Sequence, residues 1–282
     1  MENVIGQGIL EKCEVSLLDS TAHYQLLLAD SKINLNQYLG KKITLKFSGT
    51  IRCSHCGVVT KKSFGGFCYK HSQSLAQADL CYMQPHHCHF AQGTCREPEF
   101  AKNVCFAPHY VYLSNTSGIK VGITRENQIP TRWIDQGAIQ GLAFLRVSSR
   151  FQSGLMEKLL SEKVMDKTDW RKMIKFPGEK IDMHRALENL LRELGDEIES
   201  LEDEIHRRDG AGQIAWLKVP LAVEINYPVL KYPTVVKSVS FDDMSEVQGT
   251  LQGIKGQYLF LDQYVFNMRK HTGYEFEFKG EI

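Results

Sequence analysis

The chain has 282 residues, with 34 Lys and Arg against 33 Asp and Glu, a formal net charge of +1 and eight cysteines. This length allows two or three domains with a sizeable core, and the balanced charge excludes a chain-wide cationic field as the means of attracting nucleic acid. No run approaches the ~18 apolar residues of a membrane span, and the N-terminal sequence lacks the features of a secretory signal. We therefore expect a cytoplasmic protein with no membrane partner, in which reduced cysteines favour metal binding over disulfides.

Residues 1–50 are predicted to be rich in β-structure. Three apolar runs separated by Asp, Asn and Gly turns are typical of short strands: Gly8–Leu10, Tyr24–Ala29 and Ile43–Phe47. The last run alternates apolar with polar side chains, as expected of a strand with one buried face. It leads directly into the first pair of cysteines.

The first cysteine cluster has the pattern C-x2-C-x11-C-x2-H, formed by Cys53, Cys56, Cys68 and His71. Two ligands at this short spacing can bind one metal ion from a tight turn, and a second such pair completes a tetrahedron. The pattern therefore predicts a structural zinc site. The alternative is a group of unrelated buried thiols, which rarely produces two such spacings.

A second block of cysteines has no pair at this short spacing. Its four members are separated by six, six and nine residues: Cys81, Cys88, Cys95 and Cys105. We interpret them as ligands of a second zinc ion, and a nearby histidine could replace any one of them: His86, His87, His89 or His109. The alternative is that some of these thiols are buried as small apolar groups. Residues 51–108 are thus predicted to form a zinc-ribbon-like module with one or two Zn²⁺.

A β-hairpin followed by a helix is predicted after this module. Two apolar runs, Tyr110–Leu113 and Ile119–Ile123, flank a connector of small polar residues that ends in Gly118. Pro130 is placed as at the start of a helix. The hairpin and the helix would direct three polar side chains toward one region: Tyr112, Lys120 and Arg132.

This stretch resembles the core of the GIY-YIG nuclease superfamily, in which a Tyr on each hairpin strand and an Arg on the next helix surround a phosphate. Tyr112 matches the first Tyr, Gly122 the glycine of the second motif, and Arg132 the helix Arg. Lys120 stands where the second Tyr is expected, as it does in a phage-associated branch of the superfamily. The resemblance implies a small α/β module at residues 109–175.

A helix is predicted over Phe151–Asp166, with Glu157 sharing an apolar face with Val164. A carboxylate in that place needs a partner. In the superfamily the corresponding helix carries the glutamate that holds a divalent metal, so the resemblance implies that Glu157 binds Mg²⁺ or Mn²⁺. The alternative is a helix-edge glutamate paired with a neighbouring Lys or Arg.

These residue types suit phosphodiester chemistry. Arg132 could grip the phosphate oxygens with a bidentate fork that Lys cannot imitate. Tyr112 could orient the water or the phosphate, with a contribution from the Tyr110 hydroxyl on the same strand. Lys120 is protonated at neutral pH unless burial changes its pKa, so it suits a phosphate clamp better than a general base.

The surrounding segment is also basic. Residues 119–175 hold 11 Lys and Arg against 6 Asp and Glu, a local excess of five positive charges. This excess suits a phosphate-bearing ligand, although ordinary variation on a solvated surface would produce it too. Four residues are candidates for contact with DNA or RNA: Lys120, Arg125, Arg132 and Trp133. Aromatic side chains such as Trp133, Tyr110 and Tyr112 could stack on bases.

One long amphipathic helix is predicted at residues 180–209. Six apolar residues within Asp182–Arg208 are spaced alternately by four and three, as in the seam of a coiled coil. We interpret it as a helix that covers part of the core, and a small dimer seam is the alternative. Gly195 weakens it near its middle.

Residues 214–282 are predicted to form a C-terminal β-rich domain, to which residues 1–50 could be joined. The candidate strands are Val219–Ile225, Thr234–Val239, Val247–Ile254, Gln257–Asp262 and Tyr274–Phe278. The fold class is therefore α+β, with the zinc-ribbon-like and GIY-YIG-like modules inserted between two β-rich segments. The whole chain resembles a bacterial family of unknown function in its blocks GTCR, KVGITR, PTRWIDQGA and GIKGQYL.

The function predicted from these features is metal-dependent hydrolysis of phosphodiester bonds in nucleic acid. One alternative is a protein that binds nucleic acid on the same scaffold without cleaving it. A second alternative is a zinc-stabilised adaptor that uses the amphipathic helix for contacts. The sequence does not distinguish DNA from RNA.

Overall fold

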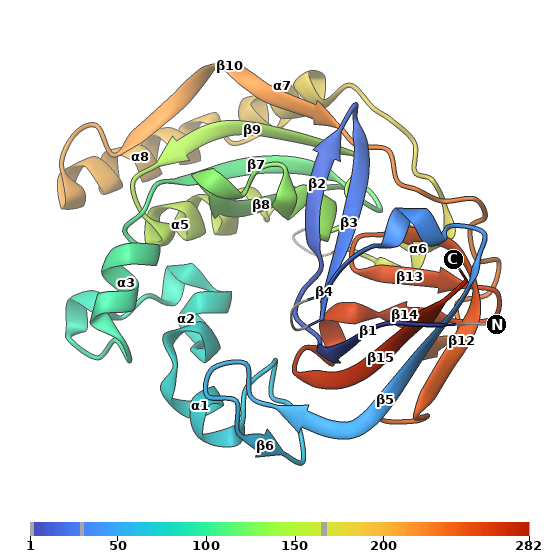
Figure 1. The fold of residues 1–282 in the computed structure, drawn as a ribbon. Coiled ribbons are helices and arrows are strands. Elements are labelled where there is room, and N and C mark those ends of the chain that lie inside the picture. The colour runs from blue at the N-terminus through green and yellow to red at the C-terminus, as the bar shows by residue number, and fades with distance from the viewer. Residues whose placement is uncertain (1–2, 29–30, 165–167, 282) are drawn as a thin grey trace.

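A computed structural model describes residues 3–28, 31–164 and 168–281 and has an α+β fold (Figure 1). The strands are β1 (Asn3–Ile9), β2 (Glu14–Leu18), β3 (Thr21–Leu28), β4 (Ser31–Asn34), β5 (Lys42–Arg52), β6 (Val59–Thr60), β7 (His109–Asn115), β8 (Ile119–Arg125), β9 (Gln140–Val147), β10 (Ile214–Glu224), β11 (Ser238–Val239), β12 (Glu246–Lys255), β13 (Tyr258–Leu261), β14 (Val265–Asn267) and β15 (Tyr274–Gly280).

The α-helices are α1 (Tyr69–Ser74), α2 (Leu80–Met83), α3 (Pro98–Val104), α4 (Thr131–Asp135), α5 (Arg150–Leu160), α6 (Trp170–Lys175), α7 (Met183–Glu193) and α8 (Gly195–Asp209). Short 3₁₀ helices are η1 (Leu35–Tyr38), η2 (Ala76–Ala78), η3 (Pro85–His87), η4 (Phe90–Gln92), η5 (Glu126–Gln128) and η6 (Met268–His271).

The largest sheet joins the two ends of the chain. Its strand order is β1-β15-β5-β12-β13-β14-β11, with β6 added to β5. Within it, β1 lies antiparallel to β15, and β5 lies between β15 and β12. The termini therefore lie close together (Figure 1). Inward-facing aromatic residues of this sheet, such as Phe276 and Phe278, pack with the small β2-β3-β4 sheet in one hydrophobic core.

The predicted hairpin is present as β7 and β8, which belong to a second sheet with the order β10-β9-β7-β8. Along β7, Val111 and Leu113 face a core that includes Met156 and Leu160 of α5. Tyr112 lies on the opposite face of the sheet, as the alternation of a strand requires, and packs edge-on against Trp133 of α4 with ring centroids 5.8 Å apart. One face of the hairpin thus packs into a hydrophobic core, and the opposite face carries Tyr112 with its polar hydroxyl group.

The predicted long helix is two helices, α7 and α8, and this corrects the continuous interpretation. The break falls at Leu194, whose φ of −123° and ψ of 18° are not helical. The seam still packs inward, because Leu187, Leu194 and Ile198 are buried against the β7–β10 sheet. The segment therefore covers the chain's own core, which was the favoured interpretation.

Other differences concern where elements begin and end. The helix predicted over Phe151–Asp166 ends at Leu160, where the Ser161 hydroxyl donates to the Glu157 carbonyl oxygen at 2.6 Å. Asp166 lies outside the described residues, as does Ala29 of the strand predicted near the N-terminus. The first strand of the segment 214–282, β10, pairs with β9 in the hairpin sheet and not with the C-terminal strands.

Candidate metal centres and anion pocket

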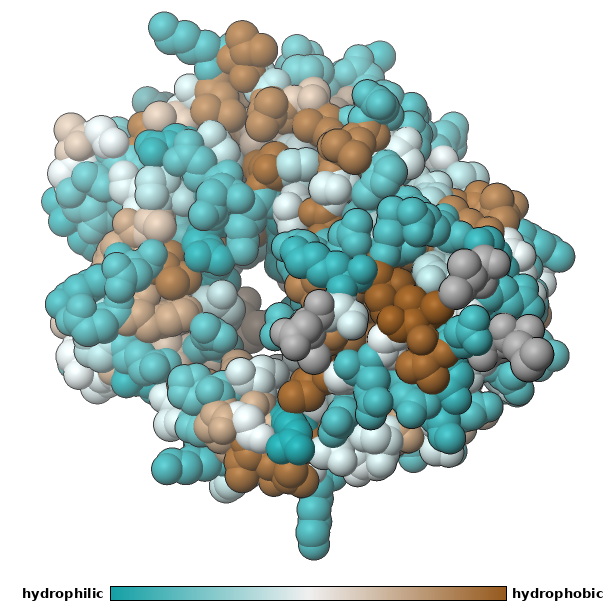
Figure 2. All heavy atoms as spheres, viewed as in Figure 1, coloured by the Kyte–Doolittle hydropathy of each residue, from teal (hydrophilic) through white to brown (hydrophobic). Residues whose placement is uncertain are grey.

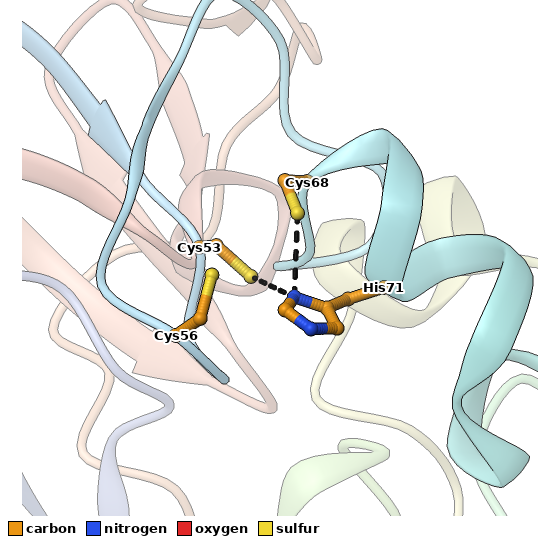
Figure 3. Close-up of side chains that lie close together, drawn as sticks. All are labelled: Cys53, Cys56, Cys68 and His71. Atoms are coloured by element: carbon orange, nitrogen blue, oxygen red, sulfur yellow. Dashed lines mark hydrogen bonds between the residues drawn. The ribbon is translucent and has the colours of Figure 1, made fainter.

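The first cysteine cluster is assembled from two short segments (Figure 3). Cys53 and Cys56 lie in the turn after β5, whereas Cys68 immediately precedes α1 and His71 lies within it. The His71 Nδ1 atom is 3.5 Å from the Cys53 sulfur and 3.3 Å from the Cys68 sulfur. All four ligand atoms lie within 4.8 Å of one another.

This geometry fits a tetrahedral metal ion. Zinc bound at about 2.3 Å from sulfur and about 2.0–2.1 Å from nitrogen places these two ligand atoms roughly 3.5 Å apart. Burial disfavours the Cys53 thiolate, but the backbone N–H groups of Cys68, Cys56 and His55 and the His71 ring outweigh it and lower the pKa of Cys53 to about 6. The cluster could therefore hold a structural metal such as zinc, with the Cys53 thiolate favoured as one ligand.

The four cysteines of the second block converge differently. They line one small cavity of about 30 Å³: Cys81, Cys88, Cys95 and Cys105. The compact group in this block is instead Asp79, Cys81 and His89, whose ligand atoms lie within 4.8 Å of one another. The Asp79 carboxylate is already engaged, because it pairs with Arg96 at 2.6 Å and accepts from the Cys81 N–H.

Three of the histidines predicted as possible replacement ligands lie away from the cavity of the second block. His109 is fully buried, and its Nδ1 pairs with the Ala107 carbonyl oxygen at 2.7 Å. Burial lowers the pKa of His109 to about 4. His86 and His87 lie in η3 with their ring centroids 4.2 Å apart and the rings tilted by 44°, and neither they nor His109 line the cysteine cavity.

A polar cavity of about 200 Å³ lies beside β8, the edge strand of the hairpin sheet. We call it the anion pocket. Its lining includes four of the residues predicted from sequence: Tyr112, Lys120, Arg132 and Glu157. Tyr82 and Met83 of α2 line another side, and Arg269 of η6 reaches it from the C-terminal segment. Figure 2 shows the molecule hollowed near its centre, and in Figure 1 α2 and β8 lie beside that region.

The hairpin register explains the central contact of the pocket. Tyr112 lies directly opposite Gly122, and a Cβ atom at Gly122 would come within 2.7 Å of the Tyr112 hydroxyl. Tyr112 is fully buried, and its hydroxyl donates to the Gln136 Oε1 atom at 3.1 Å. Burial raises the pKa of Tyr112 and the charge of Arg132 opposes this. The hydroxyl is therefore protonated at neutral pH and acts as a hydrogen-bond donor.

The pocket is strongly cationic. Of the described residues that line it, four carry a positive charge and Glu157 carries the negative one: Lys120, Arg132, Arg150 and Arg269. The Lys120 side chain is only 6% exposed. The Arg150 guanidinium is fixed by the Tyr82 carbonyl oxygen at 2.6 Å and lies 4.4 Å from the Tyr82 ring. Several cations around one small polar space favour an anionic ligand.

Three contributors to the pocket escaped sequence reasoning. They are Gln136, Arg150 and Arg269. Arg269 is 112 residues beyond Glu157 along the chain, and no local spacing connects the two. The close approach of Tyr112 to Gly122 could have drawn attention to Gln136, which follows Arg132 by one helical turn.

Three residues predicted for the site do not line the pocket: Tyr110, Arg125 and Trp133. The Tyr110 hydroxyl donates to the Glu126 carboxylate at 3.0 Å, and Arg146 holds the same carboxylate. Tyr110 is therefore a member of a separate ion-pair network. Trp133 is fully buried beneath the sheet. The prediction that Trp133 or Tyr112 stacks on bases is wrong, because neither ring has a solvent-exposed face. Arg125 ends β8, one residue beyond the part that lines the pocket.

Residues 40–276 match a family described as "Protein of unknown function (DUF2797)", and the chain belongs to this family. No curated protein and no solved structure matches the chain. Within residues 3–28, 31–164 and 168–281, no helix is both long and apolar enough to cross a membrane.

Proposed function

We propose that this protein binds nucleic acid at the anion pocket and hydrolyses phosphodiester bonds there, on a scaffold similar to that of GIY-YIG nucleases. The proposal rests on the fact that the residues predicted from separate sequence motifs lie together in the structure. Four residues that the sequence motifs indicate without any knowledge of contacts all line one cavity: Tyr112, Lys120, Arg132 and Glu157. We further propose that Cys53, Cys56, Cys68 and His71 bind one structural zinc.

The side chains of the pocket have distinct roles in this proposal. Arg132 and Arg150 would hold the non-bridging oxygens of the phosphate, and a planar guanidinium can do so with two parallel hydrogen bonds. Tyr112 would donate its hydroxyl proton to an oxygen of the phosphate or of the attacking water. It would not abstract a proton, because burial keeps its pKa raised.

Lys120 would neutralise charge rather than take a proton. Its side chain is buried in the pocket wall, where limited access of water lowers the effective dielectric constant and strengthens its attraction to a phosphate. In the superfamily a Tyr stands at this position and contributes a hydroxyl. A lysine there would favour ligand binding over activation of water.

Among the described residues that line the pocket, Glu157 is the one with a carboxylate. It would bind the divalent cation. One carboxylate is compatible with Mg²⁺ or Mn²⁺, because Mg²⁺ usually keeps several waters and takes its other ligands from phosphate oxygens. Such an ion supplies charge neutralisation and a more acidic water. Glu157 would hold the ion, and Arg132 would orient the phosphate beside it.

The proposal is tested by incubating pure protein with labelled DNA and RNA, single- and double-stranded, with and without Mg²⁺ or Mn²⁺. Glu157→Gln should abolish cleavage and leave binding largely intact, because a neutral amide is a poor ligand for a hard cation. Arg132→Lys should lose most activity, since removal of one preorganised donor typically costs about 10²–10³-fold in rate. Glu162→Gln, just beyond α5 and outside the pocket, is the matched control and should change neither property.

The second candidate function is binding of nucleic acid without cleavage. It is favoured by the presence of Lys120 where the superfamily has a tyrosine. Affinity should then fall steeply with salt as counterions are released, and Lys120→Ala should weaken it. Neutralising acidic residues of α8, which lie outside the pocket, should not. Lys120→Tyr restores the usual superfamily residue, so cleavage gained by this variant would show that the scaffold supports the chemistry. A protein that neither cuts nor binds any of these substrates would leave the adaptor alternative.

A further inference from the structure

The four cysteines of the second block are not arranged as the ligands of a single metal ion. Four sulfurs bound to one zinc at about 2.3 Å lie only about 3.8 Å apart in a tetrahedron. The sulfurs of Cys81, Cys88, Cys95 and Cys105 do not form such a group, whereas the ligands of the first cluster do. The two cysteine sets of one chain are therefore arranged for different occupants.

The cavity that these four cysteines line together with apolar side chains is also larger than one ion. The cavity is about 30 Å³, and a water molecule needs only about 10–15 Å³ measured in this way. A zinc ion in contact with four sulfurs leaves no space of that size among its ligands. An occupant that fills the cavity has to contain several atoms.

The walls of the cavity favour an inorganic cluster over a polar ligand. Apart from the cysteines they are mainly apolar, and they include Phe90, Phe100 and Phe106. Phe90 and Phe106 pack edge to face with centroids 4.8 Å apart. Such a shell limits the access of solvent, which is one of the factors that control an iron–sulfur centre.

One charged group faces this cavity as well. Arg150 lines it, and the Arg150 backbone N–H donates to the Cys105 carbonyl oxygen at 2.6 Å. The Nε atom of Arg150 is buried and has no hydrogen-bond partner among the described residues. A buried donor without a partner is costly, and a negatively charged cluster would offer it one.

We propose that Cys81, Cys88, Cys95 and Cys105 bind an iron–sulfur cluster through four thiolates, and that the zinc of this protein is confined to the first cluster. Each cysteine comes from a separate short element: α2, the end of η3, the turn after η4 and the end of α3. Four thiolates are the usual ligand set of [2Fe–2S] and [4Fe–4S] clusters. Arg150 also lines the anion pocket, so the cluster would help to position one of the pocket's cations.

The test begins with the wild-type protein, purified without oxygen from cells supplied with iron. The expected composition is iron and acid-labile sulfide in equal amounts with one zinc per chain, and a broad visible absorption from sulfur-to-iron charge transfer. Protein stripped of metal should regain that absorption when treated without oxygen with ferric iron, sulfide and a thiol, because the ferric iron supplies the oxidation state that the cluster needs and the thiol reduces any excess. Either two or four irons per chain would support the proposal.

Two variants distinguish the clusters. Cys95→Ser should lose the visible absorption and the sulfide while retaining zinc, and Cys56→Ser should lose zinc while retaining the absorption. The proposal is overturned by two zinc ions per chain without sulfide, by iron bound without sulfide, or by failure of reconstitution. Because the composition of the wild-type protein is decisive by itself, a variant that does not fold leaves the test intact.

Discussion

Tyr112 and Gly122 face each other so closely across the hairpin that a side chain at position 122 would overlap the tyrosine ring. Gly122 has an ordinary strand conformation, so its value lies in the missing side chain and not in backbone freedom. The tyrosine ring occupies the volume that a Cβ atom would take. The hydroxyl is thereby held against Gln136 at the base of the anion pocket.

Gly122→Ala should therefore displace Tyr112 and destabilise the fold by about 1–3 kcal/mol, the usual cost of overpacking a core. Ligand binding at the pocket should weaken at the same time. Chemical denaturation measures the first effect, and nucleic-acid titration measures the second. In a Tyr112→Ala background the same substitution should cost less, because its steric partner is gone. An equal cost in both backgrounds would contradict the proposed contact.

His271 is a second residue whose surroundings make a quantitative prediction. Its Nδ1 pairs with the Asn267 carbonyl oxygen at 2.8 Å, and its Nε2 accepts from the Phe241 N–H at 3.1 Å. The neutral ring satisfies both partners, whereas a second ring proton would face the Phe241 N–H. Burial accordingly lowers the pKa of His271 from 6.5 to about 4.

A lowered folded-state pKa means that the unfolded chain binds the proton more readily. The contribution of His271 to stability should be fully present above pH 6.5 and lost as the pH falls through about 4, amounting to about 3 kcal/mol. The free energy of unfolding should be measured across this range for wild type and for His271→Gln, which cannot titrate. Their difference isolates His271 from His109 and from the metal ligands. Parallel pH profiles for the two proteins would refute the assignment.

At the scale of elements, periodicity predicted which segments are helices and strands better than where they end. The β7–β8 hairpin follows directly from its apolar runs and turn. The break between α7 and α8 does not, because the apolar seam continues across Leu194 and only Gly195 signals an interruption. The pairing of β10 with β9 is also invisible to local patterns, since a strand's partner is decided by tertiary packing.

Gly195→Ala tests whether glycine weakens this helix pair. A Cβ atom at Gly195 would meet nothing within 4 Å, and its backbone conformation is open to any residue. The substitution should therefore raise the free energy of unfolding by about 0.5–1 kcal/mol through reduced freedom of the unfolded chain. Gly141→Ala is the contrasting control, because its Cβ would overlap the Trp133 ring, and it should destabilise. A loss of stability in Gly195→Ala would show that the break requires glycine.

At the scale of the whole molecule, the anion pocket is a meeting point of three parts of the chain. The hairpin and α5 supply the residues that sequence reasoning found. Their motifs are local, so spacing and resemblance were sufficient to select them. Tyr82 and Arg269 come from segments that precede and follow the hairpin module, and only folding places them beside it. The first cysteine cluster was likewise predictable because its four residues form two close pairs. The widely spaced second block, interpreted as ligands of a second zinc ion, left the exact ligands open.

The cysteine-rich part has little apolar packing of its own. None of the described residues 53–108 belongs to the three hydrophobic core clusters, and several of its large apolar side chains are exposed, including Val59, Tyr69 and Met83. Its regular structure is limited to short helices and the two-residue strand β6. A metal bound at the proposed sites would therefore contribute much of the free energy that orders this part.

Removal of metal should accordingly unfold the cysteine-rich part before the two larger sheets. Limited proteolysis after chelation should cut within residues 53–108 and leave the hairpin sheet protected, because its core is independent of the cysteines. Nucleic-acid affinity should fall together with this cleavage, since Tyr82 and Met83 form one wall of the anion pocket. Restoring the metals should restore both resistance and affinity. Persistence of an uncut segment, after elemental analysis has verified complete metal loss, would mean that α1–α3 are held by packing against α5 instead.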